Sequence, residues 1–225
     1  MVRALDLEAE AEATWSNGGI VLCHRNATRH QLNAAVRKRL NHPLTQVMAG
    51  EPLMVVQNNR RLDLYNGEVI SVLTKPETLN SGPLVVRDRY SNSSAYVDFQ
   101  VTNLQGGIGP VLIADREVLG TIGTIGGSAL RWASRMLLDT RWEAGDSARP
   151  VFLQANLGYC ITTHKSQGSS FPDVLFVLEP SVRLHVVVDY PGVLTLKSMS
   201  NIRMENREAL AKIYWHFSQL AKSEN

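Results

Sequence analysis

Residues 158–171 read GYCITTHKSQGSSF. This stretch begins with apolar residues and continues with a run of polar side chains, and a second apolar run, VLFVL, occupies residues 174–178. The pattern predicts a strand, a polar turn with a short helix, and a further strand. Hydroxyl, imidazole, ammonium and amide groups would then meet at the end of the first strand. Backbone amides at a helix start and a lysine both favour an anion, so phosphate is the natural ligand for this set.

A second strand–turn–helix unit lies near the start of the sequence. Residues 20–23, IVLC, are wholly apolar, as in strands that are buried in parallel sheets. Arg25 lies in the polar turn that follows, and apolar residues then recur at helical spacing over residues 32–40. Asn26 or Thr28 is the expected N-cap of this helix. The two units predict an α/β fold with a parallel sheet.

The middle of the chain has a different pattern of apolar and turn residues. Short runs with strand character alternate with turn residues, at residues 53–56, 68–73, 84–87, 95–101 and 111–113. Several short strands at regular spacing predict a small antiparallel barrel. Gly67, in an Asn-Gly turn, is expected to have a positive φ.

The net charge and the number of cysteines exclude few classes of function. The net charge of +2 is too small to indicate nucleic-acid binding by itself. Cys23 and Cys160 lie in apolar runs, which predicts buried free thiols rather than a disulfide or a zinc site. No apolar stretch is long enough to span a bilayer and no signal-peptide pattern opens the chain, so we expect a cytoplasmic protein without a membrane partner.

The order of residues in 158–171 resembles motif V of superfamily 1 DNA helicases of the RecD-like or UvrD-type branch. The unit at 20–40 resembles motif IV of these helicases, with Asn26 and Asn33 at the matching positions. Between the two, the chain matches the residues that open an SH3-like insertion in the same family, namely Asn59, Asn66, Gly67 and Glu68.

This resemblance implies an α/β fold in which a RecA-like parallel sheet with helices is interrupted by an inserted small antiparallel β-barrel of the SH3 type. Residues 20–50 and 150–225 would form the second RecA-like lobe of a helicase. Residues 51–149 would form the barrel with a loop-rich extension, and residues 1–19 a lead segment. A helix is expected over residues 206–222 from its apolar stripe.

The resemblance also implies two groups of site residues. The first would contact the phosphates of single-stranded DNA: Thr162, Thr163, His164 and Lys165. The second would shape the turn and couple it to the nucleotide cleft: Asn26, Ser166, Gln167 and Gly168. Structural roles are the alternative, because Thr162 could simply finish a strand and Ser166 could cap a helix.

A catalytic arginine is harder to place. The family's motif VI is not recognisable, and the nearest candidate is Arg203 in SNIRM, where an exposed arginine at a helix start is the competing interpretation. Arg25 is the other candidate for a γ-phosphate contact, with His24 or Arg29 as alternatives if the register differs. Ser170 stands where the family usually has a glutamate associated with the nucleotide ribose, which puts that contact in doubt.

The sequence contains no phosphate loop of the form G-x-x-x-x-G-K-[ST]. We therefore expect the second lobe of an ATP-dependent DNA helicase that needs ATP and Mg²⁺ in the full enzyme and is inactive as an ATPase alone. Its partners would be single-stranded DNA and a first RecA-like lobe on the same or another chain. The alternative is a non-enzymatic nucleic-acid-binding or partner-binding module derived from such a lobe.

The predicted barrel offers one further candidate surface. Basic and aromatic side chains there could guide a single strand, or could form an ordinary solvated face. They are Arg87, Arg89, Tyr90 and Tyr96.

Overall fold

The computed structural model of the protein separates into two units, Met1–Phe176 and Val177–Asn225. The residues it describes are 6–43, 45–79, 84–88, 90–121, 125–167, 171–177, 184–189 and 193–198. Gly168, Ser170, Arg203, Arg89 and the expected helix over residues 206–222 lie outside them.

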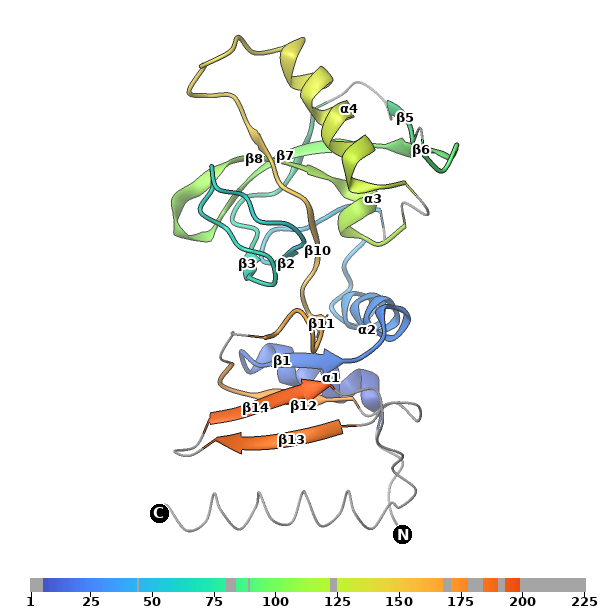
Figure 1. Cartoon of the computed structure of the whole chain (residues 1–225), viewed down its shortest axis with the longest axis vertical. Coiled ribbons are helices and arrows are strands. Elements are labelled where there is room, and N and C mark those ends of the chain that lie inside the picture. Colours follow the sequence, from blue (N-terminus) through green and yellow to red (C-terminus); the bar gives the residue numbers. More distant parts are fainter. Residues whose placement is uncertain are drawn as a thin grey trace. The chain divides into compact units, whose positions relative to one another are not determined.

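Three parallel strands form the sheet that carries both sequence motifs (Figure 1). β1 (Ile20–Cys23) is the central strand and pairs with β11 (Cys160–Thr162) and β12 (Val174–Phe176). All four residues of β1 are buried, as in a strand covered on both faces. The predicted α/β fold with a parallel sheet is confirmed. Cys23 and Cys160 are buried free thiols, as expected.

Two helices pack against this sheet. α1 (Leu7–Ser16) begins after Asp6, whose carboxylate accepts a hydrogen bond from the Ala9 N–H at 3.2 Å. α1 contacts β1 and α2 (Asn26–Arg39). The N-cap of α2 is Arg25, without a side-chain cap bond, so α2 begins slightly earlier than expected and neither Asn26 nor Thr28 caps it.

The middle of the chain folds into three further sheets with helices. Their strand orders are β10-β2-β3, β4-β7-β8-β9 and β5-β6, and all neighbours are antiparallel except β8 and β9. The strands are β2 (Pro52–Val55), β3 (Val69–Ser71), β4 (Glu77–Thr78), β5 (Leu84–Arg87), β6 (Ser94–Val97), β7 (Phe99–Leu104), β8 (Ile108–Ala114), β9 (Val151–Phe152) and β10 (Ala155–Leu157). The helices are α3 (Asp115–Val118) and α4 (Gly127–Asp139), with a 3-10 turn at Gln105–Gly107.

Within the described residues these strands do not close into a barrel, so the expected SH3-like barrel is not confirmed. α4 gives the physical reason. Its Leu130 and Leu138 pack in one core cluster with Phe99 of β7 and Leu112 of β8. A sheet face that is covered by a helix buries its apolar side chains without curling back on itself.

The second unit contains an antiparallel hairpin of β13 (Leu184–Asp189) and β14 (Val193–Ser198), in which Leu184 pairs with Ser198. The apolar run over residues 184–189 is therefore a strand. In the part of the chain that is described, no helix has both the length and the apolar character needed to cross a bilayer.

A buried ion pair fixes the connection between α2 and β2. The Arg37 Nε atom lies 2.6 Å from Glu51 Oε1, and the two side chains are 2% and 0% exposed. Glu51 also accepts hydrogen bonds from the Tyr159 hydroxyl at 3.0 Å and from the Met48 N–H at 2.7 Å. Burial and the neighbouring Glu51 carboxylate raise the pKa of Tyr159, so its hydroxyl stays protonated and serves as a donor.

Candidate nucleic-acid interface

The two polar turns predicted from the sequence meet at one edge of the parallel sheet. β1 and β11 run in the same direction, and Cys23 pairs with Thr162 at their carboxyl ends. The Thr163 N–H donates a hydrogen bond to the Cys23 carbonyl at 2.9 Å, which ties the second turn to the end of β1. Ligands of open α/β sheets bind at this kind of edge.

The turn after β11 is held by its own hydrogen bonds. The N–H groups of Lys165 and Ser166 donate to the Thr162 carbonyl at 2.8 and 3.1 Å, and the Ser166 hydroxyl donates to the Thr163 carbonyl at 2.9 Å. Thr162 and Thr163 are buried, Lys165 and Ser166 are half-buried, and His164 is exposed. The threonines and Ser166 therefore build the turn, and His164 and Lys165 are the side chains with access to a ligand.

Gln167, which follows Ser166, is also exposed. At the other turn, His24, Arg25 and Asn26 are exposed at the start of α2. The edge thus presents polar and basic groups from both turns to solvent.

Asn33 anchors α2 to β11. Its Nδ2 donates to the Cys160 carbonyl and its Oδ1 accepts from the Cys160 N–H, at 2.9 and 3.0 Å. A second bond from Nδ2 reaches the Arg29 carbonyl at 2.9 Å. Asn33 is buried, and its hydrogen bonds hold α2 against β11 and so fix the distance between the two turns.

Arg29 is the most unusual side chain near this edge. It is 6% exposed, and its Nε atom is buried without a hydrogen-bond partner. Its Nη2 lies 3.0 Å from His30 Nε2, and no carboxylate pairs with it among the described residues. Burial lowers the pKa of Arg29, and burial followed by the charge of Arg29 lowers the pKa of Lys165. Arg29 and Lys165 are thus two neighbouring cations, and none of the described carboxylates pairs with either of them.

Sequence reasoning named Arg29 only as an alternative to Arg25. The signal that could have found it is its spacing, because Arg29, Leu32, Asn33 and Val36 lie on one buried face of α2. A charged residue at an apolar position of a helix is rarely buried without a partner.

The Asn66-Gly67 turn packs directly on the turn after β11. Lys165 Nζ donates to Asn66 Oδ1. Gly67 has φ +97°, and a Cβ atom there would lie 2.3 Å from the Lys165 carbonyl oxygen. The predicted positive φ of Gly67 is confirmed, and a side chain at this position would displace the candidate interface.

We expect Gly67→Ala to lower the free energy of unfolding by about 1 to 3 kcal/mol, because alanine resists the positive φ and its methyl group collides with backbone. Chemical denaturation of both proteins measures the difference. Gly50→Ala is the matched control, because Gly50 also has a positive φ, +85°, but open space around it. A loss for Gly67→Ala no larger than that for the control would contradict the close packing.

Asn156 links the Arg29 guanidinium to the backbone of Glu117, whose side chain is also buried. With its amide oriented to satisfy both neighbours, Asn156 accepts a hydrogen bond from Arg29 Nη1 at 3.3 Å and donates one to the Glu117 carbonyl at 2.9 Å. Burial raises the pKa of the Glu117 side chain from 4.5 to about 7, although a hydrogen bond from Gln154 and the charge of Arg131 oppose the shift.

Glu117 should therefore make stability depend on pH. The folded chain binds this proton more tightly than the unfolded chain, so stability falls as pH rises from 4.5 to about 7. We expect Glu117→Gln to be more stable than wild type above that window, by on the order of 3 kcal/mol, and to lose this advantage at low pH. Urea titrations at several pH values measure it, with the exposed Glu143→Gln as control. A difference that stays constant with pH would contradict the shifted pKa.

The second surface considered from the sequence lies on the β5–β6 hairpin. Val85 pairs with Tyr96, and Arg87 pairs with Ser94. These four residues are exposed, and the residues between them along each strand are buried or half-buried. Arg87 and Tyr96 therefore lie on the solvent face of the hairpin. Tyr90, in the turn between the strands, is 93% exposed.

The described residues contain no group of three or more His, Cys, Asp or Glu side chains that could hold a metal ion.

No protein-family model matches the chain, and no curated protein matches it. Among solved structures it is similar, at a low level, to helicases. One is unliganded Pif1 from Bacteroides sp, at 14% identity and TM-score 0.31, where the match covers 73% of this chain and 48% of that one. Bacteroides sp Pif1 in complex with ADP-AlF4 is 16% identical, with TM-score 0.29 and coverages of 76% and 38%. A structure of two coordinating Pif1 helicases at forked dsDNA is 15% identical, with TM-score 0.30 and coverages of 76% and 35%. The chain spans less than half the length of each.

Proposed function

We propose that this chain is the second lobe of an ATP-dependent DNA helicase of superfamily 1, in the RecD-like or UvrD-type branch, and that it binds the backbone of single-stranded DNA. In this proposal residues 20–50 and 150–225 belong to the lobe, and residues 51–149 are an insertion of SH3-like ancestry. The other half of the ATP cleft belongs to a first lobe on the same or another chain.

The observation that carries the proposal is the pair of polar turns at one carboxyl edge, next to the buried Arg29, which no described carboxylate neutralises. Protein groups bind DNA phosphates through cationic side chains, backbone N–H groups and hydroxyls, without reading the base. His164 and Lys165 project from one turn and Arg25 from the other, whereas Thr162, Thr163 and Ser166 hold the second turn in shape.

The same edge also fits one side of a nucleotide site. Arg29 adds a buried positive charge beside this edge that no described carboxylate neutralises, and such a charge favours a bound phosphate. Arg25, Asn26 and Gln167 surround the edge and would orient the phosphates. When bound between two lobes with Mg²⁺, ATP supplies the phosphoryl transfer that drives movement along DNA. The chain alone, without the phosphate loop, is expected to show no ATPase activity.

Fluorescence anisotropy with a labelled oligo-dT strand tests the DNA-binding part. We expect affinity that falls steeply between about 50 mM and about 200 mM salt, because phosphate binding releases counterions. His164→Ala/Lys165→Ala should weaken binding by roughly tenfold or more, since the loss of one charge-assisted contact, that of Lys165, already costs about 1.5 kcal/mol.

Lys38→Ala/Lys75→Ala is the control, because both lysines are exposed and lie outside the two turns. It should leave most of the affinity intact. An equal loss of affinity in both variants would mean that only the overall charge matters. A well-folded wild type that does not bind the oligo-dT strand would contradict the proposal.

A further inference from the structure

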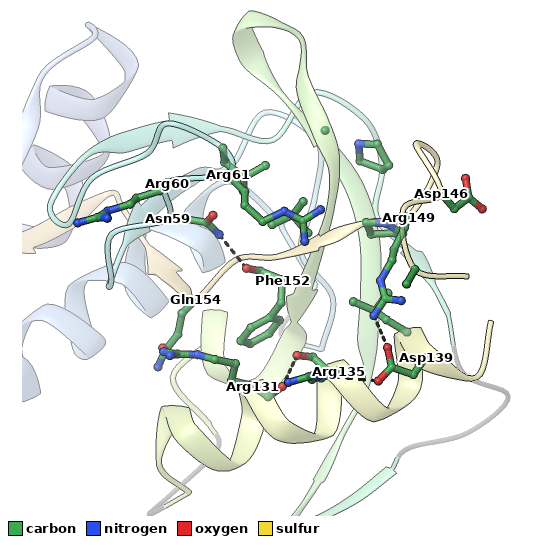
Figure 2. A pocket seen from close by; sticks show the side chains of 18 of the residues that line it. Asn59, Arg60, Arg61, Arg131, Arg135, Asp139, Asp146, Arg149, Phe152 and Gln154 are labelled. Atoms are coloured by element: carbon green, nitrogen blue, oxygen red, sulfur yellow. Dashed lines mark hydrogen bonds and ion pairs between the residues drawn. The ribbon is translucent and has the colours of Figure 1, made fainter. Parts of the chain in front are cut away.

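A second basic site lies between α4, the residues before β9 and the turn after β2. It is a pocket of about 870 Å³. Figure 2 shows arginine side chains reaching it from all three segments. None of its lining residues belongs to the turns at the edge of the parallel sheet. The basic lining residues are Arg60, Arg61, Arg131, Arg135 and Arg149.

The positive charge of this pocket is only partly compensated. Arg149 and Arg135 share one carboxylate, that of Asp139, and the Arg135 Nε atom is 3.8 Å from it. Arg131 donates to the neutral Gln57 amide. Arg60 and Arg61 make no ion pair or side-chain hydrogen bond with any residue that the structure describes. Asp146 is the other acidic lining residue, and its Oδ1 accepts from the Ala148 N–H at 2.8 Å.

The walls of the pocket are held in place before any ligand binds. Asn59 Nδ2 donates to the Phe152 carbonyl at 2.9 Å, which ties the turn carrying Arg60 and Arg61 to β9 (Figure 2). The Phe152 ring packs edge-on against Phe99, with ring centres 6.1 Å apart. Arg149 also donates to the Trp142 carbonyl at 3.3 Å. Such preorganisation lowers the entropic cost of binding.

We propose that this pocket binds closely spaced phosphate groups. Guanidinium groups are the side chains best matched to phosphate, because their planar fork makes two parallel hydrogen bonds to its oxygens. The Gln57 and Asn58 side chains add neutral amides at the rim. The volume suits a compact ligand of a few phosphates. The phosphates come either from a small polyphosphate or from a stretch of nucleic-acid backbone.

Isothermal titration calorimetry on the full chain tests the proposal, with tripolyphosphate in one arm and a short oligo-dT strand in the other. The variant is Arg60→Ala/Arg61→Ala, which removes two exposed and unpaired side chains and should leave the melting temperature unchanged. Lys38→Ala/Lys75→Ala removes the same charge elsewhere and is the control. We expect the arginine variant to weaken binding in at least one arm by about tenfold or more, and the control to change it little.

Loss in the tripolyphosphate arm would identify a small polyphosphate as the ligand. Loss in the oligo-dT arm alone would identify nucleic-acid backbone. Binding of neither probe would overturn the proposal, as would equal losses in the arginine variant and the lysine control. His164→Ala/Lys165→Ala separates this site from the edge of the sheet, because tripolyphosphate binding in the pocket should survive it.

Discussion

Glu51→Ala should lower the free energy of unfolding by about 3 to 5 kcal/mol, which is the usual cost of removing one partner from a buried ion pair. The Arg37 side chain is 2% exposed, so without Glu51 its charge has no water to replace the lost carboxylate. The Tyr159 hydroxyl and the Met48 N–H lose their acceptor at the same time. Arg37 keeps two carbonyl contacts, to Pro43 and Gln46, which limit the loss.

Chemical denaturation at neutral pH measures this loss. Glu51→Gln keeps the shape and an acceptor oxygen, so it should cost less than Glu51→Ala. Glu77→Ala removes an exposed glutamate of β4 and should change stability by less than about 0.5 kcal/mol. A cost for Glu51→Ala as small as that of the control would mean that the Arg37–Glu51 pair does not hold the connection between α2 and β2.

Arg29→Leu should raise stability and weaken ligand binding at once. The native arginine is buried, its Nε atom has no partner, and no described carboxylate compensates its charge. Replacing it with a similar-sized apolar side chain removes the cost of that charge, and we expect a gain of about 1 kcal/mol. The same change should weaken binding of single-stranded DNA by roughly tenfold, because a positive charge next to the two phosphate-binding turns is lost.

This opposite movement of stability and binding separates a functional arginine from a structural one. Arg29→Lys keeps the charge but loses the planar fork, so its affinity should lie between those of wild type and Arg29→Leu. Denaturation and anisotropy on the same three proteins give both quantities. Lower stability of Arg29→Leu with unchanged DNA binding would show that Arg29 serves the fold alone.

The parallel sheet was predictable because its signals are local. The apolar run at 20–23 and the polar turn after residue 162 each occupy one short window of sequence. Periodicity and turn residues decide such windows. The positive φ of Gly67 was predictable for the same reason, because glycine has no Cβ atom and adopts this conformation without steric strain.

The sheets of the middle segment were not predictable in the same way. Their pairing joins strands that are distant in the sequence, such as β8 with β9 and β2 with β10. Short strands with turn residues between them are equally compatible with a barrel and with separate sheets covered by a helix. The choice depends on which apolar faces pack together. In this protein α4 packs on the apolar face of β7 and β8, which would be the interior face of a barrel.

The candidate sites show the same division. The turn after β11 could be recognised from its residues alone. The burial of Arg29 depends on the packing of α2 against β11 through Asn33, and the arginine pocket depends on three segments that meet only in the folded chain. The net charge of the whole sequence indicates neither the buried Arg29 nor the arginine pocket, because it is only +2.

The most direct test of the central claim is nuclear magnetic resonance of the isotope-labelled chain during titration with a short oligo-dT strand. The account predicts that the amides of His24 to Arg29 and of Thr163 to Gln167 shift first and most, because these two turns share the carboxyl edge of the sheet. The amides of the β5–β6 hairpin should shift less. Shifts that avoid both turns, with the fold intact, would contradict the assignment of this edge as the DNA-binding surface.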